Sequence, residues 1–282
     1  MIALIVKRLI ATAFVMAFVA FFVFGLLHLA PGDPAAVIAG DIATKEDIER
    51  IRATLGLDLI MQRVEPTLAL TTTTILLSVV VAIPLGIVAA WRSSSWIDRT
   101  TMGFAVLGFS VPVFVFAYLL IMVFAAHLKL VPVMGYVSPF KDMGGFLRAI
   151  ALPTVALGVT YVALIARITR ASMLEAINQD YIRTAHAKGL GIVPILFRHA
   201  LRNASVPIVT TVGIGIALLI GGVVVTESVF AIPGLGRLTA DSILRRDYPI
   251  VQGVILIFSG IYVLINLTID IIYILVDPRI RY

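Results

Sequence analysis

Long apolar runs alternate with short polar segments along this chain of 282 residues. An α-helix needs about 20 mostly apolar residues to cross the ~30 Å hydrocarbon core of a bilayer. Six runs are long enough: Leu9–Ala30, Thr67–Ala90, Thr101–Ala126, Ile150–Ile168, Ala204–Val225 and Ile250–Val276. The pattern therefore predicts an all-α membrane protein in which residues 1–282 form a single transmembrane domain.

Composition agrees with this class, because 60% of the residues are hydrophobic and 13% are charged, against roughly 25% charged in a soluble domain. The first span follows Lys7 and Arg8. It is longer than the apolar region of a signal peptide, and no small-residue cleavage site follows it, so we expect an uncleaved anchor. The chain has no cysteine, which excludes disulfides and thiolate metal sites.

The distribution of charge gives weak guidance on orientation. With the amino terminus inside, 12 of the 22 basic residues lie on the cytoplasmic side, so the positive-inside rule discriminates little by itself. Most acidic residues then lie outside, which adds modest support. We expect a multi-pass membrane protein with its amino terminus in the cytoplasm.

The segment 31–66 is predicted to be the first outer loop. It opens with the turn sequence Pro31–Pro34. Thr44 followed by Asp47 is typical of a helix start, and we expect a short amphipathic helix there, with Ile48, Ile51 and Leu55 on one face. A solvated linker helix and a binding element explain this pattern equally well.

Prolines and glycines occur inside several of the predicted spans. Pro84 and Pro112 favour kinks because each removes a backbone donor, and they serve either packing alone or helix movement during transport. Small residues let helices approach closely, and the fifth span contains several: Gly213, Gly215, Gly221 and Gly222. Packing within the bundle explains these glycines best, and contact with a second, similar subunit is the alternative.

The outer segment 226–249 is too apolar for a loose linker. Phe230, Ile232 and Leu235 need burial, Pro233–Gly234 and Gly236 are expected to break the helix, and residues 241–246 are expected to restart one. We predict an ordered segment folded over the mouth of the bundle, acting either as a docking surface for a soluble partner or as a plug.

The inner segment 171–203 is charged yet suited to helix formation. Residues 171–187 predict a helix, Gly189 and Gly191 predict a C-cap and turn, and Pro194 suits the first turn of a second helix. Such a rigid bend with basic side chains favours docking onto a partner outside the bilayer. A solvated basic loop near anionic lipid would not need the two glycines.

Motifs for chemistry are few. None of the five lysines is followed by Ser or Thr, so the chain lacks a P-loop and any ATP is hydrolysed by another chain. Asp270 is the only acidic residue inside a predicted span. A hydrogen bond to a neighbouring helix explains it better than a proton relay. The four histidines are scattered, without metal-ligand spacing, and no enzymatic reading is supported.

Several motifs, taken in order, resemble the permease subunit of bacterial ABC importers of the dipeptide, oligopeptide and nickel type. They are Pro31–Pro34, Ser110–Pro112, Thr169–Ser172, Asp180–Gly189, Arg198–Asn203, Glu227 with Phe230, Pro233–Arg237, Arg246–Pro249 and Asp277–Arg279. The segment Arg183–Gly189 is similar to the EAA loop of that family, although Arg183 stands where the motif has Glu. Together these motifs extend over nearly the whole chain, in the order in which the family has them.

The resemblance implies the type I ABC importer permease fold, with six transmembrane helices, and alternating access driven by partner subunits. The implied partners are a second homologous permease, two ABC ATPases that bind ATP and Mg, an extracytoplasmic substrate-binding protein and membrane lipid. No cofactor and no nucleic acid is expected on this chain. The implied ATPase-coupling residues are Arg183, Thr184, Ala185, His186, Lys188 and Gly189. The implied docking residues for the binding protein are Phe230, Pro233, Gly234, Leu235, Gly236 and Arg237.

One departure from the family pattern follows Asp58, where family members usually carry a further outer segment before the second span. The first outer loop is therefore either short in this protein or incomplete in the sequence. The expected substrates are dipeptides, oligopeptides or glutathione. Nickel chelates, haem precursors and an ion-coupled carrier mechanism are the alternatives.

Overall fold

The computed structural model describes residue 18 and residues 45–276, with side-chain surroundings from residue 59 onward except at 220, 270 and 273–276. Its α-helices are α3 (Lys45–Trp91), α4 (Trp96–Ser110), α5 (Val113–Leu120), α6 (Met143–Ile177), α7 (Asp180–Ala187), α8 (Ile192–Pro194), α9 (Leu201–Val229), α10 (Leu235–Leu244) and α11 (Tyr248–Val276). Two π-helical segments, η1 (Ile121–His127) and η2 (Ile195–Ala200), continue α5 and α8. The described residues contain no strand, and the predicted all-α class is confirmed. The predicted span Leu9–Ala30 and the side chain of Asp270 lie outside the described part.

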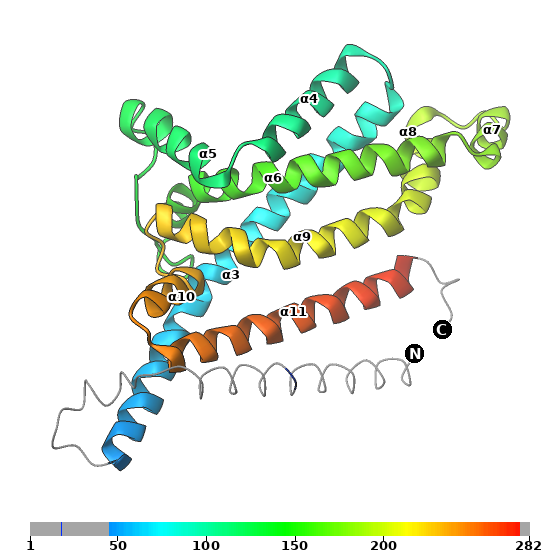
Figure 1. The fold of residues 1–282 in the computed structure, drawn as a ribbon. Coiled ribbons are helices and arrows are strands. Elements are labelled where there is room, and N and C mark those ends of the chain that lie inside the picture. Colours follow the sequence, from blue (N-terminus) through cyan, green and yellow to red (C-terminus); the bar gives the residue numbers. More distant parts are fainter. Residues whose placement is uncertain (1–17, 19–44, 277–282) are drawn as a thin grey trace.

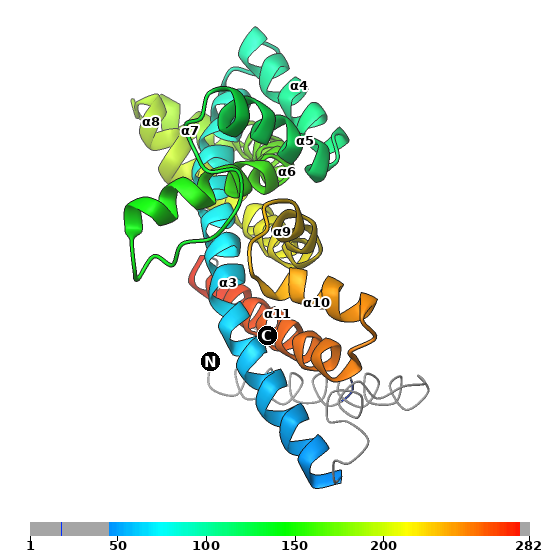
Figure 2. The ribbon, with the colours of Figure 1, turned by 90° about the vertical axis from the view of Figure 1, so that its left-hand side faces the viewer.

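Long helices form a bundle with a small helical element at each end (Figure 1). Helix α6 packs against α3 and α9, and α11 packs against α9 and α3. Helices α7 and α8 lie at one end and α10 lies at the opposite end (Figure 1), and Figure 2 views the bundle from the α10 side, nearly along α9. We call residues 171–203 the α7 end and residues 226–249 the α10 end.

Four described helices are long and apolar enough to span a membrane, and α4 with α5 can form a fifth span. The predicted span Thr101–Ala126 is therefore not one continuous helix, because α4 and the segment after it meet at 104°. Pro112 explains the break. It lacks an N–H, and it holds Val111 in an extended conformation at ψ 124°. Pro84, by contrast, lies within the continuous helix α3.

Two helix boundaries differ from the prediction. Helix α3 begins at Lys45 but continues to Trp91, so the expected short external helix is the first part of a longer one. The helix expected over residues 171–187 is interrupted, since α6 ends at Ile177 and α7 begins at Asp180. Gln179 is extended at ψ 151°, and Asp180 then places a negative charge in the favourable first turn of α7.

Glycines allow the closest helix contacts. A Cβ at Gly86 of α3 would lie 2.5 Å from the Cβ of Thr169 on α6. In α9, a Cβ at Gly222 would meet Leu157 at 2.8 Å, and one at Gly213 would overlap Ile269 of α11. Packing within the chain therefore accounts for Gly213 and Gly222, as predicted, whereas a Cβ at Gly221 would meet nothing within 4 Å.

An ion pair fixes the start of α4 to α6. Asp98 is 4% exposed, accepts the Ser94 N–H at 2.9 Å, and accepts from the Arg170 guanidinium, with Nη2 2.6 Å from Oδ2. A buried carboxylate is tolerated only with such partners. The pair therefore holds the turn between α3 and α4 against the C-terminal part of α6.

Candidate functional site

Helix α7 presents one apolar face and one polar face. Ile182 and Ala185, three residues apart, are 2% and 6% exposed, and they lie in one buried cluster with residues of α3, α6 and α9. Residues three or four apart share a helix face, so Arg183 and His186 point the other way and are exposed. The apolar face fixes α7 to three long helices, while the polar face is free.

The turn after α7 is a Schellman motif built on Gly189. The Leu190 N–H donates to Ala185 O at 3.2 Å, and the Gly189 N–H donates to His186 O at 2.9 Å. These are the two hydrogen bonds that define the motif. Gly189 has φ +79°, in the left-handed backbone region that residues other than Gly and Asn rarely adopt. The predicted C-cap at Gly189 is confirmed.

Five of the six predicted coupling residues lie together on the exposed surface of the α7 end: Arg183, Thr184, His186, Lys188 and Gly189. Ala185 does not share this surface, because it packs into the chain. Arg183 forms an exposed ion pair with Asp180 at 3.4 Å. Pairs of this kind contribute little to stability, so Arg183 remains available to a partner.

An exposed apolar group lies beside α7, and the sequence did not lead us to two of its members, Val193 and Phe197. Leu190, Val193 and Phe197 are 39%, 62% and 54% exposed, whereas Ile195 and Leu196 between them are buried. Val193 and Phe197 are four residues apart, a spacing that could have predicted a shared helical face. The α7 end therefore offers both basic and apolar contacts.

The α10 end is organised by two polar side chains that are almost fully buried. Thr67 of α3 is 4% exposed and Glu227 of α9 is 0% exposed. The Thr67 hydroxyl donates to Glu227 Oε1 at 2.5 Å and accepts the Leu235 N–H at 2.7 Å. The Arg237 N–H donates to Glu227 Oε2 at 2.9 Å. The two side chains thus accept hydrogen bonds from backbone N–H groups of α10 that, in the first turn of any helix, have no partner within the helix.

This capping explains why the predicted break at Gly236 and the restart at 241–246 are wrong. Helix α10 already begins at Leu235, because Thr67 and Glu227 accept its first donors. The break at Pro233–Gly234 is confirmed, with Gly234 extended at ψ 179°. A Cβ at Gly236 would lie 2.7 Å from the Val224 Cα, so glycine lets α10 approach α9.

The Glu227 carboxyl group lies two residues beyond the predicted fifth span, Ala204–Val225. Burial raises the pKa of Glu227 to about 7, and the hydrogen bond from Thr67 acts in the opposite direction. Desolvation disfavours the charged form of a carboxyl group. The group that caps α10 therefore titrates near neutral pH.

The predicted docking residues lie mostly inside the α10 end. Phe230, Gly234, Leu235 and Gly236 are buried, and Pro233 and Arg237 are partly exposed. The freely exposed positions come later in α10 and after it: Asp241, Ile243, Leu244, Arg245 and Arg246. The predicted residues thus build the segment, and its outer face is formed by residues 241–246.

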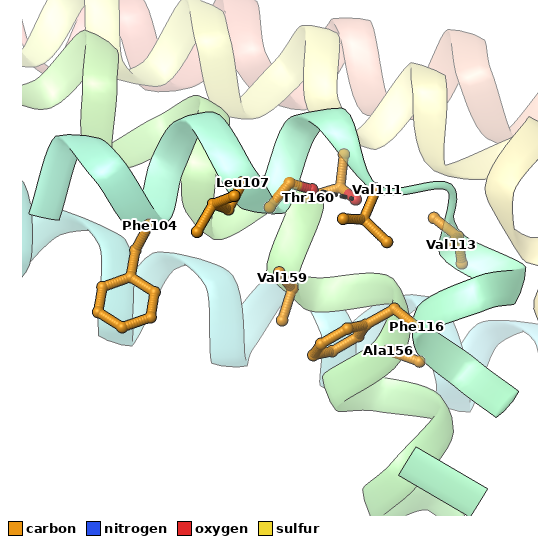
Figure 3. A pocket seen from close by; sticks show the side chains of 9 residues that line it. Phe104, Leu107, Val111, Val113, Phe116, Ala156, Val159 and Thr160 are labelled. Carbon is orange, nitrogen blue, oxygen red and sulfur yellow. Dashed lines mark hydrogen bonds between the residues drawn. The ribbon is translucent and has the colours of Figure 1, made fainter. Parts of the chain in front are cut away.

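An apolar cavity of about 390 Å³ lies where α4, α5 and α6 meet, below the Pro112 break. Figure 3 shows Phe104, Leu107 and Phe116 among its lining side chains. The only hydroxyl in the lining belongs to Thr160, which donates to Gly108 O at 3.3 Å. Within the described residues no group of three His, Cys, Asp or Glu could hold a metal ion.

The arrangement of these helices is that of a permease of a type I ABC importer. A chain of the methionine ABC transporter MetNI, solved in inward-facing conformations, superposes with a TM-score of 0.63 over 78% of this chain and 97% of its own, at 22% identity. Residues 82–282 match the family described as "Binding-protein-dependent transport system inner membrane component", and residues 1–67 match its N-terminal companion. The chain belongs to this family, which makes it a transport subunit of the inner membrane.

Relatives are similar over their full length. The "Probable peptide ABC transporter permease protein y4tP" of Sinorhizobium fredii is 48% identical over 309 positions, which cover 99% of each chain. The "Glutathione transport system permease protein GsiC" of Escherichia coli K12 is 38% identical, over 99% of this chain and 98% of its own. An alignment of 309 positions exceeds the 282 residues here by 27, so y4tP carries residues that this chain lacks. That the shortening follows Asp58 stays a prediction.

Proposed function

We propose that this chain is the permease subunit of an ATP-driven importer that carries peptides, including dipeptides, oligopeptides or glutathione, into the cytoplasm. Family membership supports the transport role. The names of y4tP and GsiC, at 48% and 38% identity over 99% of this chain, support a peptide substrate.

The observation that carries the mechanism is the two-faced helix α7. Its apolar face, through Ile182 and Ala185, is packed in one cluster with α3, α6 and α9, while Arg183, Thr184 and His186 are exposed. A close-packed interior transmits displacement instead of absorbing it. A force applied to the exposed face of α7 would therefore move three long helices together.

In this proposal each of two ABC ATPase subunits seats against a permease at its α7 end, and a second homologous permease completes the pathway. ATP and Mg bind to the ATPases and no cofactor binds to this chain. ATP binding closes the ATPases, α7 carries that motion into the bundle, and the bundle opens outward to accept substrate. The α7 end then faces the cytoplasm, as does the amino terminus.

The α10 end faces the extracytoplasmic binding protein, because it lies opposite the α7 end (Figure 1). The buried residues Phe230, Gly234, Leu235 and Gly236 hold the segment in shape. The exposed residues of α10 and the turn after it make the contact. Pro233 and Arg237, which are partly exposed, lie at the edge of that contact.

Matched charge reversals at the two ends test this arrangement. Arg183→Glu alters the exposed face of α7, and Arg245→Glu makes the same change on the exposed surface of the α10 end. We expect Arg183→Glu to weaken co-purification of the ATPases about tenfold without changing binding-protein association, and Arg245→Glu to do the reverse. Loss of ATPase binding in both variants, or in neither, would contradict the assignment of the two ends.

Uptake by the reconstituted importer tests the substrate class. Proteoliposomes with both permeases, the ATPases and the binding protein should accumulate labelled dipeptide or glutathione only when ATP is supplied to the ATPases. Accumulation that persists without the ATPases would indicate an ion-coupled carrier. ATP-dependent uptake of a nickel chelate or haem precursor, but of no peptide, would refute the proposed substrate.

A further inference from the structure

A polar groove of about 350 Å³ opens beside α7, between the last turns of α6, the start of α7 and the first turns of α9. Its volume lies at the small end of the ~300–1,000 Å³ range of ligand pockets. Five polar side chains line it: Ser172, Glu175, Gln179, Tyr181 and Asn203. They come from segments up to 31 residues apart in the sequence, and only the fold brings them together.

All five side chains can accept hydrogen bonds, and an ionised Glu175 can only accept. Glu175, Gln179 and Asn203 are exposed. A concave site rich in acceptors complements a cation with several donors, above all the planar guanidinium group of arginine with its five N–H donors.

The inner segment that forms the groove is otherwise basic. Between residues 171 and 203 there are two acidic residues, Glu175 and Asp180, and four basic ones: Arg183, Lys188, Arg198 and Arg202. Asp180 is paired with Arg183, whereas Glu175 has no ion pair within the described part of the chain. Glu175 is thus the one unpaired negative charge on a basic surface.

We propose that this groove receives an arginine or lysine side chain of the docked ATPase, and that this contact sets the register in which α7 is seated. The inference rests on the proposed function, because it needs an ATPase at the α7 end. Like charges brought together at an interface are strongly unfavourable. A basic side chain of the partner is therefore favoured at Glu175, which has no ion pair within the described part of the chain, and shifted docking positions are disfavoured.

Single-cysteine cross-linking on the assembled importer tests the groove, and the chain has no native cysteine to interfere. Asn203→Cys labels the groove and Thr184→Cys labels the exposed face of α7. Each variant carries a maleimide-linked photoreactive probe, and the attached peptides are identified by mass spectrometry. We expect both variants to capture the ATPase, with the Asn203→Cys product next to an arginine or lysine.

The two possible failures are distinguishable. Absence of ATPase from the Thr184→Cys products would refute the proposed function itself. Capture of the ATPase by Thr184→Cys, together with only lipid, the second permease or nothing at Asn203→Cys, would overturn the groove assignment alone.

Affinity measurements supply the second test. We expect Glu175→Gln to weaken ATPase binding about tenfold, which corresponds to ~1.4 kcal/mol, and Glu175→Arg to weaken it further. Asp180→Asn makes the same change in net charge five residues away, outside the groove lining, and should reduce affinity at most threefold. Equal losses in Glu175→Gln and Asp180→Asn would show a general charge effect and overturn the inference.

Discussion

Replacing Gly189 by valine tests whether the turn after α7 is needed to couple ATP hydrolysis to transport. Gly189 has φ +79°, and a Cβ there would meet nothing within 4 Å. The cost of the substitution is therefore conformational, not steric. The left-handed conformation costs an L-residue roughly 1–2 kcal/mol, and a β-branched side chain is the least tolerant of it.

A penalty of one to two kcal/mol changes a two-state population by a factor of about 5–30. Because the turn is exposed and the α7 anchor at Ile182 and Ala185 is unchanged, the penalty falls on the local arrangement of Ala187–Leu190 and not on the bundle. We expect peptide uptake per ATP hydrolysed to fall about 5- to 30-fold in Gly189→Val. The thermal midpoint should shift by no more than a few degrees (~2–4 °C per kcal/mol).

Proteoliposomes containing the complete importer allow uptake and ATP hydrolysis to be measured in one sample, with the thermal midpoint of the purified chain alongside. Gly189→Asn is the matched control, because asparagine tolerates the left-handed region, and it should retain uptake within about twofold. Normal uptake in Gly189→Val would refute a role for the turn. An equal defect in Gly189→Asn would show that side-chain size at the partner contact matters, and not backbone conformation.

Three further variants test the packing and the buried charges, each by its unfolding free energy in detergent. Gly86→Ala should destabilise the chain by about 1–3 kcal/mol, because its Cβ would lie 2.5 Å from a side-chain carbon of α6. The control Gly103→Ala, whose Cβ would meet nothing within 4 Å, should be neutral or stabilising. Equal changes in unfolding free energy in the two variants would contradict the close contact between α3 and α6. Asp98→Ala should cost about 2 kcal/mol, because it leaves the partly buried Arg170 guanidinium without its partner. Asp241→Ala, in an exposed pair 3.8 Å apart, should cost less than ~0.5 kcal/mol, and similar losses in the two variants would refute the structural role of Asp98. The pKa of Glu227 is raised from 4.5 to about 7, so folding favours its protonated form. Its contribution to the free energy of unfolding is therefore complete below about pH 4.5 and is lost as the pH rises to about 7. The difference in stability between wild type and Glu227→Gln should change by roughly 3 kcal/mol over that interval, and a constant difference would contradict the burial of a titrating carboxyl group.

Features that depend on residues close in the chain were predictable. Apolar runs of about 20 residues located the second, fourth, fifth and sixth spans, although helix ends shifted by several residues. Pro112 marked the break between α4 and α5, and Gly189 marked the end of α7, because the restrictions of proline and the freedom of glycine act on the local backbone. The absence of a P-loop required only the residue after each lysine.

Features that depend on distant partners were not predictable. The predicted docking residues from Phe230 to Gly236 include four that are buried. Two of them, Phe230 and Leu235, complete apolar clusters with other helices, and the other two are glycines in close contact with α9. Ala185 belongs by sequence to the coupling motif, yet it packs inward. The orientation of a small residue on a short helix depends on which neighbours cover it.

By itself, the sequence determined the all-α membrane class, the approximate spans, the turn at Gly189 and the order of motifs that points to the permease family. Only the tertiary structure decided that α10 begins at Leu235, because its first N–H groups are accepted by Thr67 and Glu227, which lie 160 residues apart in the chain. It also decided which side chains of the α7 end face a partner and that Glu175 shares a groove with Asn203. Local backbone preferences are written in neighbouring residues, whereas hydrogen-bond partners, burial and grooves exist only once distant segments have packed together.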